Sequence, residues 1–195
     1  MLKKLFVGGA ATALAVSTAG LALAASGQGG GQAPAGGAHA TARAVTPIVC
    51  DGGVQKRVLN RIVSSPFTFS EASGTPLAPG AAVTVSGPGR GLDTLSIEFS
   101  AETQLGGSTA GDNLYDWMGL EVLVDGVPIQ PFTASGDVLA ITGSNAYNSN
   151  AAQFCTKIKP GRHRVQVRTN LHDGNVDDAL TGWLDDYTLH VEVSD

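Results

Sequence analysis

The segment from residue 92 to residue 102, LDTLSIEFSAE, constrains the fold more than any other stretch of the chain. Apolar and polar side chains alternate along it, and a β-strand produces this period of two because its successive side chains point to opposite faces of the sheet. One face of this strand is therefore expected to be buried and the other to face water, as in an antiparallel sheet. The buried face would hold Leu95, Ile97, Phe99 and Ala101, and the wet face Thr94, Ser96, Glu98, Ser100 and Glu102.

Further short β-strands are predicted along the rest of the chain. In the segment 54–63 both helical and strand spacing fit, and its β-branched residues favour a strand. Asp125 and Gly126 are a strong signal for a two-residue hairpin turn. Other strands are predicted at 67–69, 82–86, 120–124, 127–132, 138–142, 153–158, 162–169 and 187–193. The segments 143–152 and 171–184 are rich in turn residues and are predicted as loops.

The number and spacing of these strands predict the fold class. A lone sheet could not bury its apolar face, whereas two stacked sheets can bury both of theirs. The sequence shows no long amphipathic helix that could cover a sheet instead. We therefore expect one all-β domain from residue 45 to residue 195, an antiparallel β-sandwich of the jelly-roll or Greek-key type.

Residues 1–25 have the features of a secretory signal peptide. Lys3 and Lys4 precede an apolar run, and the residues Ala22-Leu23-Ala24 match a small-residue cleavage site. A membrane anchor is the alternative, but glycine and hydroxyl residues interrupt the run and no basic cluster follows it. Residues 26–44 are rich in Gly and Ala and are predicted to be a flexible linker. The sequence thus predicts a secreted, extracellular protein with no membrane span after signal cleavage.

The negative charge of the chain argues against polyanionic partners. Removing residues 1–24 would take away two lysines and no acidic residue, which changes the formal charge from −5 to −7. A chain this acidic has no long-range attraction for nucleic acid or for an anionic membrane surface. The expected partner is therefore an extracellular protein or a glycan, and association with further copies of the chain stays open.

The two cysteines, Cys50 and Cys155, predict a disulfide. Exported proteins pass through an oxidising compartment, where an even pair of cysteines usually becomes bonded. Two buried free thiols are the alternative. The spacing of the two residues matches no zinc-binding motif.

The residues Asp173, Asn175, Asp177 and Asp178 form the sharpest local pattern of candidate ligands. Oxygen-bearing side chains at alternate positions resemble the start of an EF-hand calcium loop. The pattern departs from that motif because its sixth position is Asp178 instead of Gly and its twelfth is Leu184 instead of Glu. Calcium is the one cofactor that the sequence suggests, and a solvated acidic turn is the alternative.

Four aromatic residues are expected in loops or at strand ends, where they could bind a sugar. They are Tyr115, Trp117, Tyr147 and Trp183. Exposed rings stack on the apolar faces of sugars, and Asp116, Asn145 and Asn148 could bond to the hydroxyl groups. The alternative is that the two tryptophans plug the open ends of the sandwich, because large aromatic side chains dominate core burial.

Catalytic motifs are scarce. The chain has no G-x-S-x-G elbow and no H-E-x-x-H helix. Glu98, Glu102 and Glu121 could supply a glycosidase pair, which needs two carboxylates at a set separation, but acids on the wet face of a strand are common. The leading hypothesis is an exported, non-catalytic β-sandwich that acts through surface interaction. The alternatives are a carbohydrate-binding module, assisted by calcium, and a glycan-active hydrolase.

Overall fold

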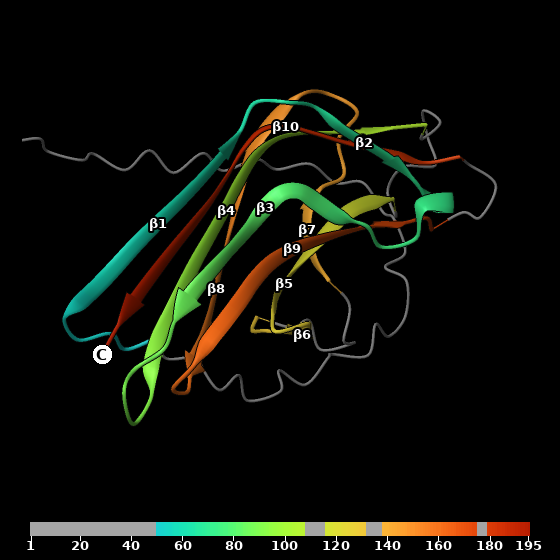
Figure 1. Ribbon diagram of the computed structural model, residues 1–195. Coiled ribbons are helices and arrows are strands. Elements are labelled where there is room, and N and C mark those ends of the chain that lie inside the picture. The colour runs from blue at the N-terminus through green and yellow to red at the C-terminus, as the bar shows by residue number, and fades with distance from the viewer. Residues whose placement is uncertain (1–49, 108–115, 132–137, 175–178) are drawn as a thin grey trace, which may run out of the picture. The chain divides into compact units, whose positions relative to one another are not determined.

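The computed structural model describes residues 50–107, 116–131, 138–174 and 179–195, all of which belong to the compact unit Val45–Asp195. These residues form two antiparallel sheets that pack face to face (Figure 1). The predicted all-β sandwich is therefore confirmed. No helix of the described residues has the length and hydropathy that crossing a membrane requires.

The first sheet, called sheet A, has the strand order β1-β10-β4-β8, and β2 pairs with the start of β10 beside β1. The strand predicted from the alternation of residues 92–102, β4, lies in the middle of this sheet between β10 and β8. The strands of sheet A are β1 (Gln55–Val63), β2 (Phe67–Ser70), β4 (Asp93–Gly106), β8 (Asn148–Ile158) and β10 (Thr181–Ser194).

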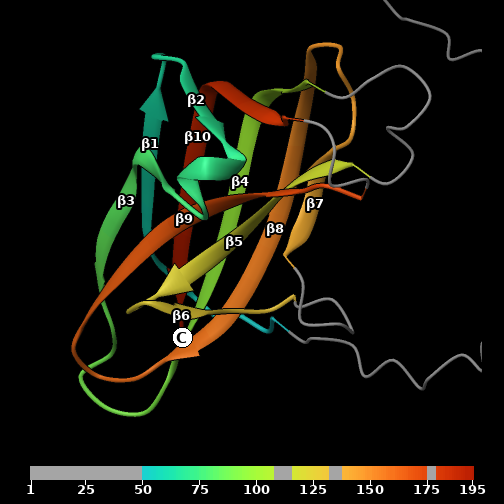
Figure 2. The same cartoon turned by 90° about the vertical axis from the view of Figure 1, so that its right-hand side faces the viewer.

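The second sheet, called sheet B, has the order β3-β9-β5, and β6 and β7 share the remaining edge of β5 (Figure 2). From β3 to β10 the main chain connections pass repeatedly from one sheet to the other, which is the jelly-roll arrangement. The strands of sheet B are β3 (Leu77–Ser86), β5 (Trp117–Val124), β6 (Val127–Pro128), β7 (Leu139–Thr142) and β9 (Arg162–His172), and a short 3-10 helix, η1 (Glu71–Ser73), precedes β3.

The core lies between the sheets and is built by the alternation that the sequence predicted. In β4 the side chains of Leu95, Ile97, Phe99 and Ala101 are buried, and those of the intervening residues lie on the outer face. The ring of Phe99 packs against the ring of Tyr187 in β10, with 5.9 Å between centroids. Apolar residues of both sheets complete the core, among them Val85, Leu120, Val122, Val165, Val167, Leu189 and Val191.

Two segments predicted as loops contain parts of long strands instead. β8 begins at Asn148 and not at residue 153, and β10 begins at Thr181 and not at residue 187. The first three residues of β8 are polar, but they pair with β4, and the Asn150 amide donates to the Thr103 hydroxyl at 2.8 Å. In β10 a bulge between Asp185 and Thr188 breaks the alternation that would have revealed the strand.

The predicted disulfide joins Cys50, which precedes β1, to Cys155 in β8. These strands are the two edges of sheet A, so the segment after Cys50 crosses the end of the sheet. The backbone of that segment is held on the way: Lys157 donates to the Asp51 carbonyl at 2.9 Å, and the Gly53 amide donates to the Asp195 carbonyl at 2.6 Å. The bond therefore fixes the segment that precedes β1 to the far edge of the sheet.

The Asp125-Gly126 hairpin joins β5 to β6, as predicted. Both residues have positive φ angles, 54° and 81°, which a two-residue hairpin turn of this type requires. Asp125 also accepts two hydrogen bonds from the start of β9, from the Arg164 amide at 2.8 Å and from Nδ1 of His163 at 2.7 Å. The other ring nitrogen of His163 lies 2.9 Å from the Lys159 carbonyl oxygen. Both neighbours are acceptors, so the ring satisfies both when it carries two protons.

This pair predicts how stability depends on pH. The hydrogen bond from His163 to Asp125 raises the pKa of His163 above 6.5, and the Arg164 amide, with His163, lowers the pKa of Asp125 below 3.8. The stabilisation that protonated His163 provides is complete below pH 6.5 and is lost as the pH rises through the raised pKa of His163. The stabilisation that ionised Asp125 provides is lost as the pH falls through the lowered pKa of Asp125. Half of the Asp125 side chain is exposed, and solvent screens the pair, so its contribution to stability should not exceed about 1 kcal/mol.

We expect His163→Gln to destabilise the protein at pH 5 and to have a smaller effect at pH 8. Urea unfolding of both proteins at the two pH values measures this difference. Equal losses of unfolding free energy at pH 5 and pH 8 would show that the protonated ring contributes nothing of its own.

Candidate functional site

The structure describes three of the four aromatic residues that were predicted to bind a sugar, and it brings two of them together. Tyr147 and Trp183 lie together, with 5.0 Å between ring centroids and an edge-to-face geometry. Trp117 belongs to sheet B, where it stacks on His172 of the neighbouring strand at 4.9 Å. Tyr115 lies outside the described residues. A single platform that combines Trp117 with Trp183 is therefore not formed.

Trp183 lies on the outer face of sheet A. Its neighbour Leu184 is fully buried, and a Cβ on its other neighbour, Gly182, would lie 2.4 Å from the ring of Phe69 in the core. Because side chains alternate along a strand, the indole points away from that core. Trp183 is half-buried and Tyr147 is 61% exposed, so the pair presents aromatic surface to solvent. Trp183 therefore does not plug an end of the sandwich, which was the alternative prediction for this residue.

The loop that carries Tyr147 is held against sheet A by hydrogen bonds. Gln104, the residue opposite Trp183 on β4, donates through Nε2 to the Asn145 carbonyl at 2.8 Å. Asn148 donates through Nδ2 to the Ala146 carbonyl at 2.8 Å, so its amide serves the turn. These bonds fix the position of the Tyr147 ring relative to Trp183.

A polar groove of 440 Å³ lies on the same outer face, next to the aromatic pair. Glu102 of β4 stands opposite Asp185 of β10 and Ser149 of β8, and it is two residues from Gln104 on the same face. Same-face neighbours along a strand are about 7 Å apart, so the aromatic pair lies at one end of the groove. The lining residues are Ser100, Ala101, Glu102, Ser149, Asn150, Ala151 and Asp186.

The bulge in β10 shapes this groove. Asp186 has a φ angle of 42° and its backbone amide donates to the Asp185 carboxylate at 2.9 Å. Neither Glu102 nor Asp186 forms an ion pair with any residue that the structure describes, so both carboxylates are available to a ligand. Asp186 and Ser149 were not predicted to belong to a sugar site. A signal for the bulge is present in the sequence: the apolar residues Leu184 and Tyr187 are three apart and not two.

The predicted calcium loop is described in part. Asp173 is described, whereas Asn175, Asp177 and Asp178 lie outside the described residues. The Gly174 amide donates to Asp116 at 3.0 Å, which ties this loop to the start of β5. Within the four described ranges no three His, Cys, Asp or Glu side chains are placed to hold a metal ion. The calcium site therefore stays a prediction.

The three glutamates considered for hydrolysis do not form one site. Glu121 is on sheet B, where Nε of Arg168 donates to its carboxylate at 2.7 Å. Glu98 and Glu102 share the outer face of β4, but four residues of a strand span about 13 Å, more than the separation that glycosidases use. Glu98 also accepts a hydrogen bond from Gln153 at 3.1 Å.

Comparison with known proteins gives no family for this chain. No protein-family profile matches it, and no curated protein matches it. Solved structures with a similar arrangement include infectious bursal disease virus, Gx strain (13% identity, TM-score 0.35) and Gt strain (14%, 0.34). Another is dimeric latent PorU from Porphyromonas gingivalis (13%, 0.31). The matches cover 77%, 77% and 74% of this chain but 36%, 38% and 14% of the other chains, so this chain spans less than two fifths of each.

Proposed function

We propose that this protein is an exported, non-catalytic binding module whose ligand is a neutral glycan, bound on the outer face of sheet A. The observation that carries the proposal is the exposed Trp183–Tyr147 pair at the end of the polar groove. Aromatic rings stack on the apolar C–H face of a sugar, and a few convergent polar groups fix its orientation. Export is supported by the signal-peptide features of residues 1–25.

The charge of the groove favours a neutral glycan. Glu102 and Asp186 line it, Asp185 is adjacent, and the chain as a whole has a net charge of −5. Carboxylates accept hydrogen bonds from sugar hydroxyls but repel the sulfates and uronic acids of anionic polysaccharides. Ser149, which stands opposite Glu102, adds a neutral hydroxyl to the same face, whereas the Asn150 amide is bonded to the buried Thr103 hydroxyl.

Trp183→Ala is expected to weaken binding to an insoluble neutral polysaccharide by about tenfold, because it removes the stacking surface. Trp117→Ala is the matched control, since it removes a half-buried tryptophan from the outer face of the other sheet and should change binding less than about twofold. Depletion assays with the chain from residue 26 onward measure both. Equal losses in the two variants, or none in either, contradict the proposed platform.

Two further measurements test the calcium-assisted and the hydrolase alternatives. Repeating the assay with chelator tests calcium: loss of binding would link the glycan to the loop at Asp173. Release of soluble reducing sugars, abolished by Glu102→Gln, would replace the binding module with a hydrolase that uses Glu102 and the aspartates of the bulge. We expect unchanged polysaccharide and no release.

A further inference from the structure

The two sheets leave free edges on the same side of the sandwich. β1 pairs with β10 and β3 pairs with β9, and no described strand pairs with the other side of either. The two free edges are neighbours, as both views show (Figures 1 and 2). Val63 of β1 and Gly80 of β3 are in contact across these edges: a Cβ on that glycine would lie 3.0 Å from the valine side chain.

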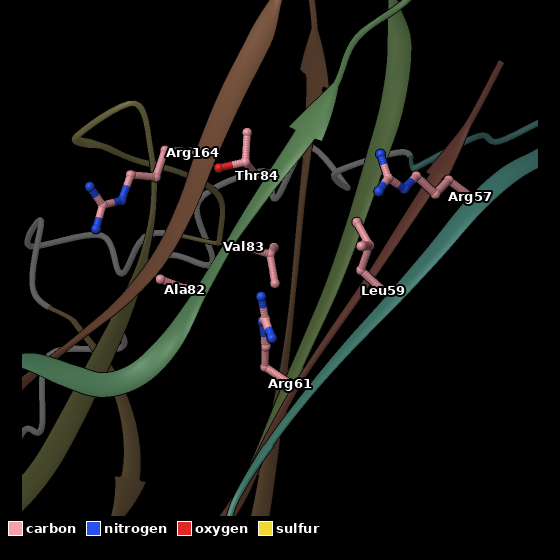
Figure 3. A pocket seen from close by; sticks show the side chains of 7 residues that line it. All are labelled: Arg57, Leu59, Arg61, Ala82, Val83, Thr84 and Arg164. Atoms are coloured by element: carbon pink, nitrogen blue, oxygen red, sulfur yellow. The ribbon is translucent and has the colours of Figure 1, made fainter.

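A groove of 360 Å³ runs between these edges and is lined by arginines (Figure 3). Arg57, Leu59 and Arg61 pair in register with buried residues of β10, so all three belong to the inward face of β1. Figure 3 shows both arginines extending from β1 toward β3, with Leu59 between them. The lining residues are Arg57, Leu59, Arg61, Ala82, Val83, Thr84 and Arg164, the last from β9 on the far side of β3.

The guanidinium groups of Arg57 and Arg61 have no acidic partner in the described part of the chain. Neither forms a salt bridge or a side-chain hydrogen bond with a described residue, whereas Arg168 and Lys56 both do. The guanidinium of Arg164 is also without such a partner, although its backbone amide donates to Asp125 at 2.8 Å. No carboxylate lines the groove, although the chain is acidic overall. This is a local positive site on a negative molecule, which selects a ligand that carries negative charge.

Two occupants from the chain itself fit poorly. Residues 1–49 contain no Asp or Glu, so that segment could not supply carboxylates to the groove. A second copy pairing antiparallel through β1 and centred on Leu59 would place Arg57 of each copy opposite Arg61 of the other. Like charges directly opposite in a sheet are destabilising.

We propose that this groove binds an extended acidic peptide segment of a protein partner, which adds as a strand to the free edge of β1. Main-chain hydrogen bonds would supply affinity, and side chains at alternate positions would supply specificity. The matching peptide carries carboxylates four residues apart, opposite Arg57 and Arg61, with an apolar residue between them opposite Leu59. Four residues of an extended strand span about 13 Å, which one small anion cannot bridge. The exposed Val58 and Ile62 on the other face of β1 add apolar contact for the same strand.

The test uses the fluorescent peptide Val-Glu-Thr-Val-Thr-Glu-Thr and the chain from residue 26 onward. We expect saturable binding that weakens with salt, and about tenfold weaker binding to the double variant Arg57→Gln and Arg61→Gln. Arg90→Gln with Arg162→Gln is the matched control, because these exposed arginines carry the same charge but do not line the groove. The permuted peptide Val-Thr-Glu-Val-Glu-Thr-Thr, with its acids on the other face, should bind about tenfold more weakly.

Strand addition also predicts a backbone pattern. N-methylation of the peptide at positions 3 and 5, or at positions 2, 4 and 6, removes the amides that point to one side of the strand. One of these sets should abolish binding while the other is tolerated. Equal binding of the permuted peptide, or equal loss in both arginine double variants, overturns the proposal. Binding of a sulfated polysaccharide with no binding of the peptide also overturns it. A third contradicting outcome is that the parent protein binds no peptide while the variant Arg57→Gln with Arg61→Gln self-associates. That outcome would mean that the arginines protect the edge of β1 against pairing with other chains.

Discussion

Removing the Cys50–Cys155 bond is expected to lower the free energy of unfolding by about 4 to 5 kcal/mol, the largest effect of any single change considered for this protein. The bond joins residues 105 positions apart. In the chain-entropy model the stabilisation grows with the logarithm of the loop that the bond closes, and a loop of this length gives the upper end of the usual range. Urea unfolding of the double variant Cys50→Ser and Cys155→Ser, compared with the oxidised parent, measures the loss.

A control separates the bond from local packing. The parent protein unfolded in the presence of reductant should show the same loss as the double serine variant, because both free the same loop. The m-value should rise in both, since the unfolded chain becomes less compact. A loss below about 1 kcal/mol with an unchanged m-value would mean that the unfolded chain is as compact without the bond as with it, which contradicts the chain-entropy account.

The substitution Phe99→Ala should cost about 3 to 5 kcal/mol. Phe99 has no exposed surface, lies in the middle of β4 and packs on the ring of Tyr187. Truncation removes the transfer free energy of the ring and leaves a cavity that strands on both sides hold open. Thermal or urea unfolding measures the change, and circular dichroism of the native state establishes that the sheet still forms.

Glu98→Ala is the matched control for this prediction. Glu98 is the preceding residue of the same strand, and its side chain lies on the outer face. Its substitution should change the unfolding free energy by no more than about 0.5 kcal/mol. Comparable losses from Phe99→Ala and Glu98→Ala would contradict the assignment of the two faces of β4.

Prediction from sequence succeeded where one side of a strand is buried and the other is wet. In residues 95–101 and 187–193 the burial of each position decides whether its side chain is apolar or polar, so the alternation can be seen in the sequence. It failed at the start of β8, where Asn148, Ser149 and Asn150 are strand residues with little apolar content. Those residues are extended because β4 supplies their hydrogen-bond partners, and a partner 45 or more residues away leaves no local signal.

The candidate sugar site was also predicted only in part from the sequence. The aromatic residues were identifiable from their type, but their grouping depended on which sheet each strand joined. Trp183 and Trp117 proved to lie on opposite outer faces, and Tyr147 reached Trp183 through a loop distant in sequence. The spacing of Leu184 and Tyr187 marks the bulge at Asp186, but the strand pairing decides that the bulge lies beside Glu102.

The amino-acid sequence by itself determined the class of the fold, the central strand, the hairpin at Asp125 and the pairing of the two cysteines. These follow from alternation, turn chemistry and cysteine number, each of which is expressed by neighbouring residues or by composition. Only the tertiary structure decided that Arg57 and Arg61 face a groove between two free edges, and that Trp183 meets Tyr147. Those arrangements bring together residues from distant segments, and the packing of two sheets, which no local pattern encodes, sets which segments become neighbours.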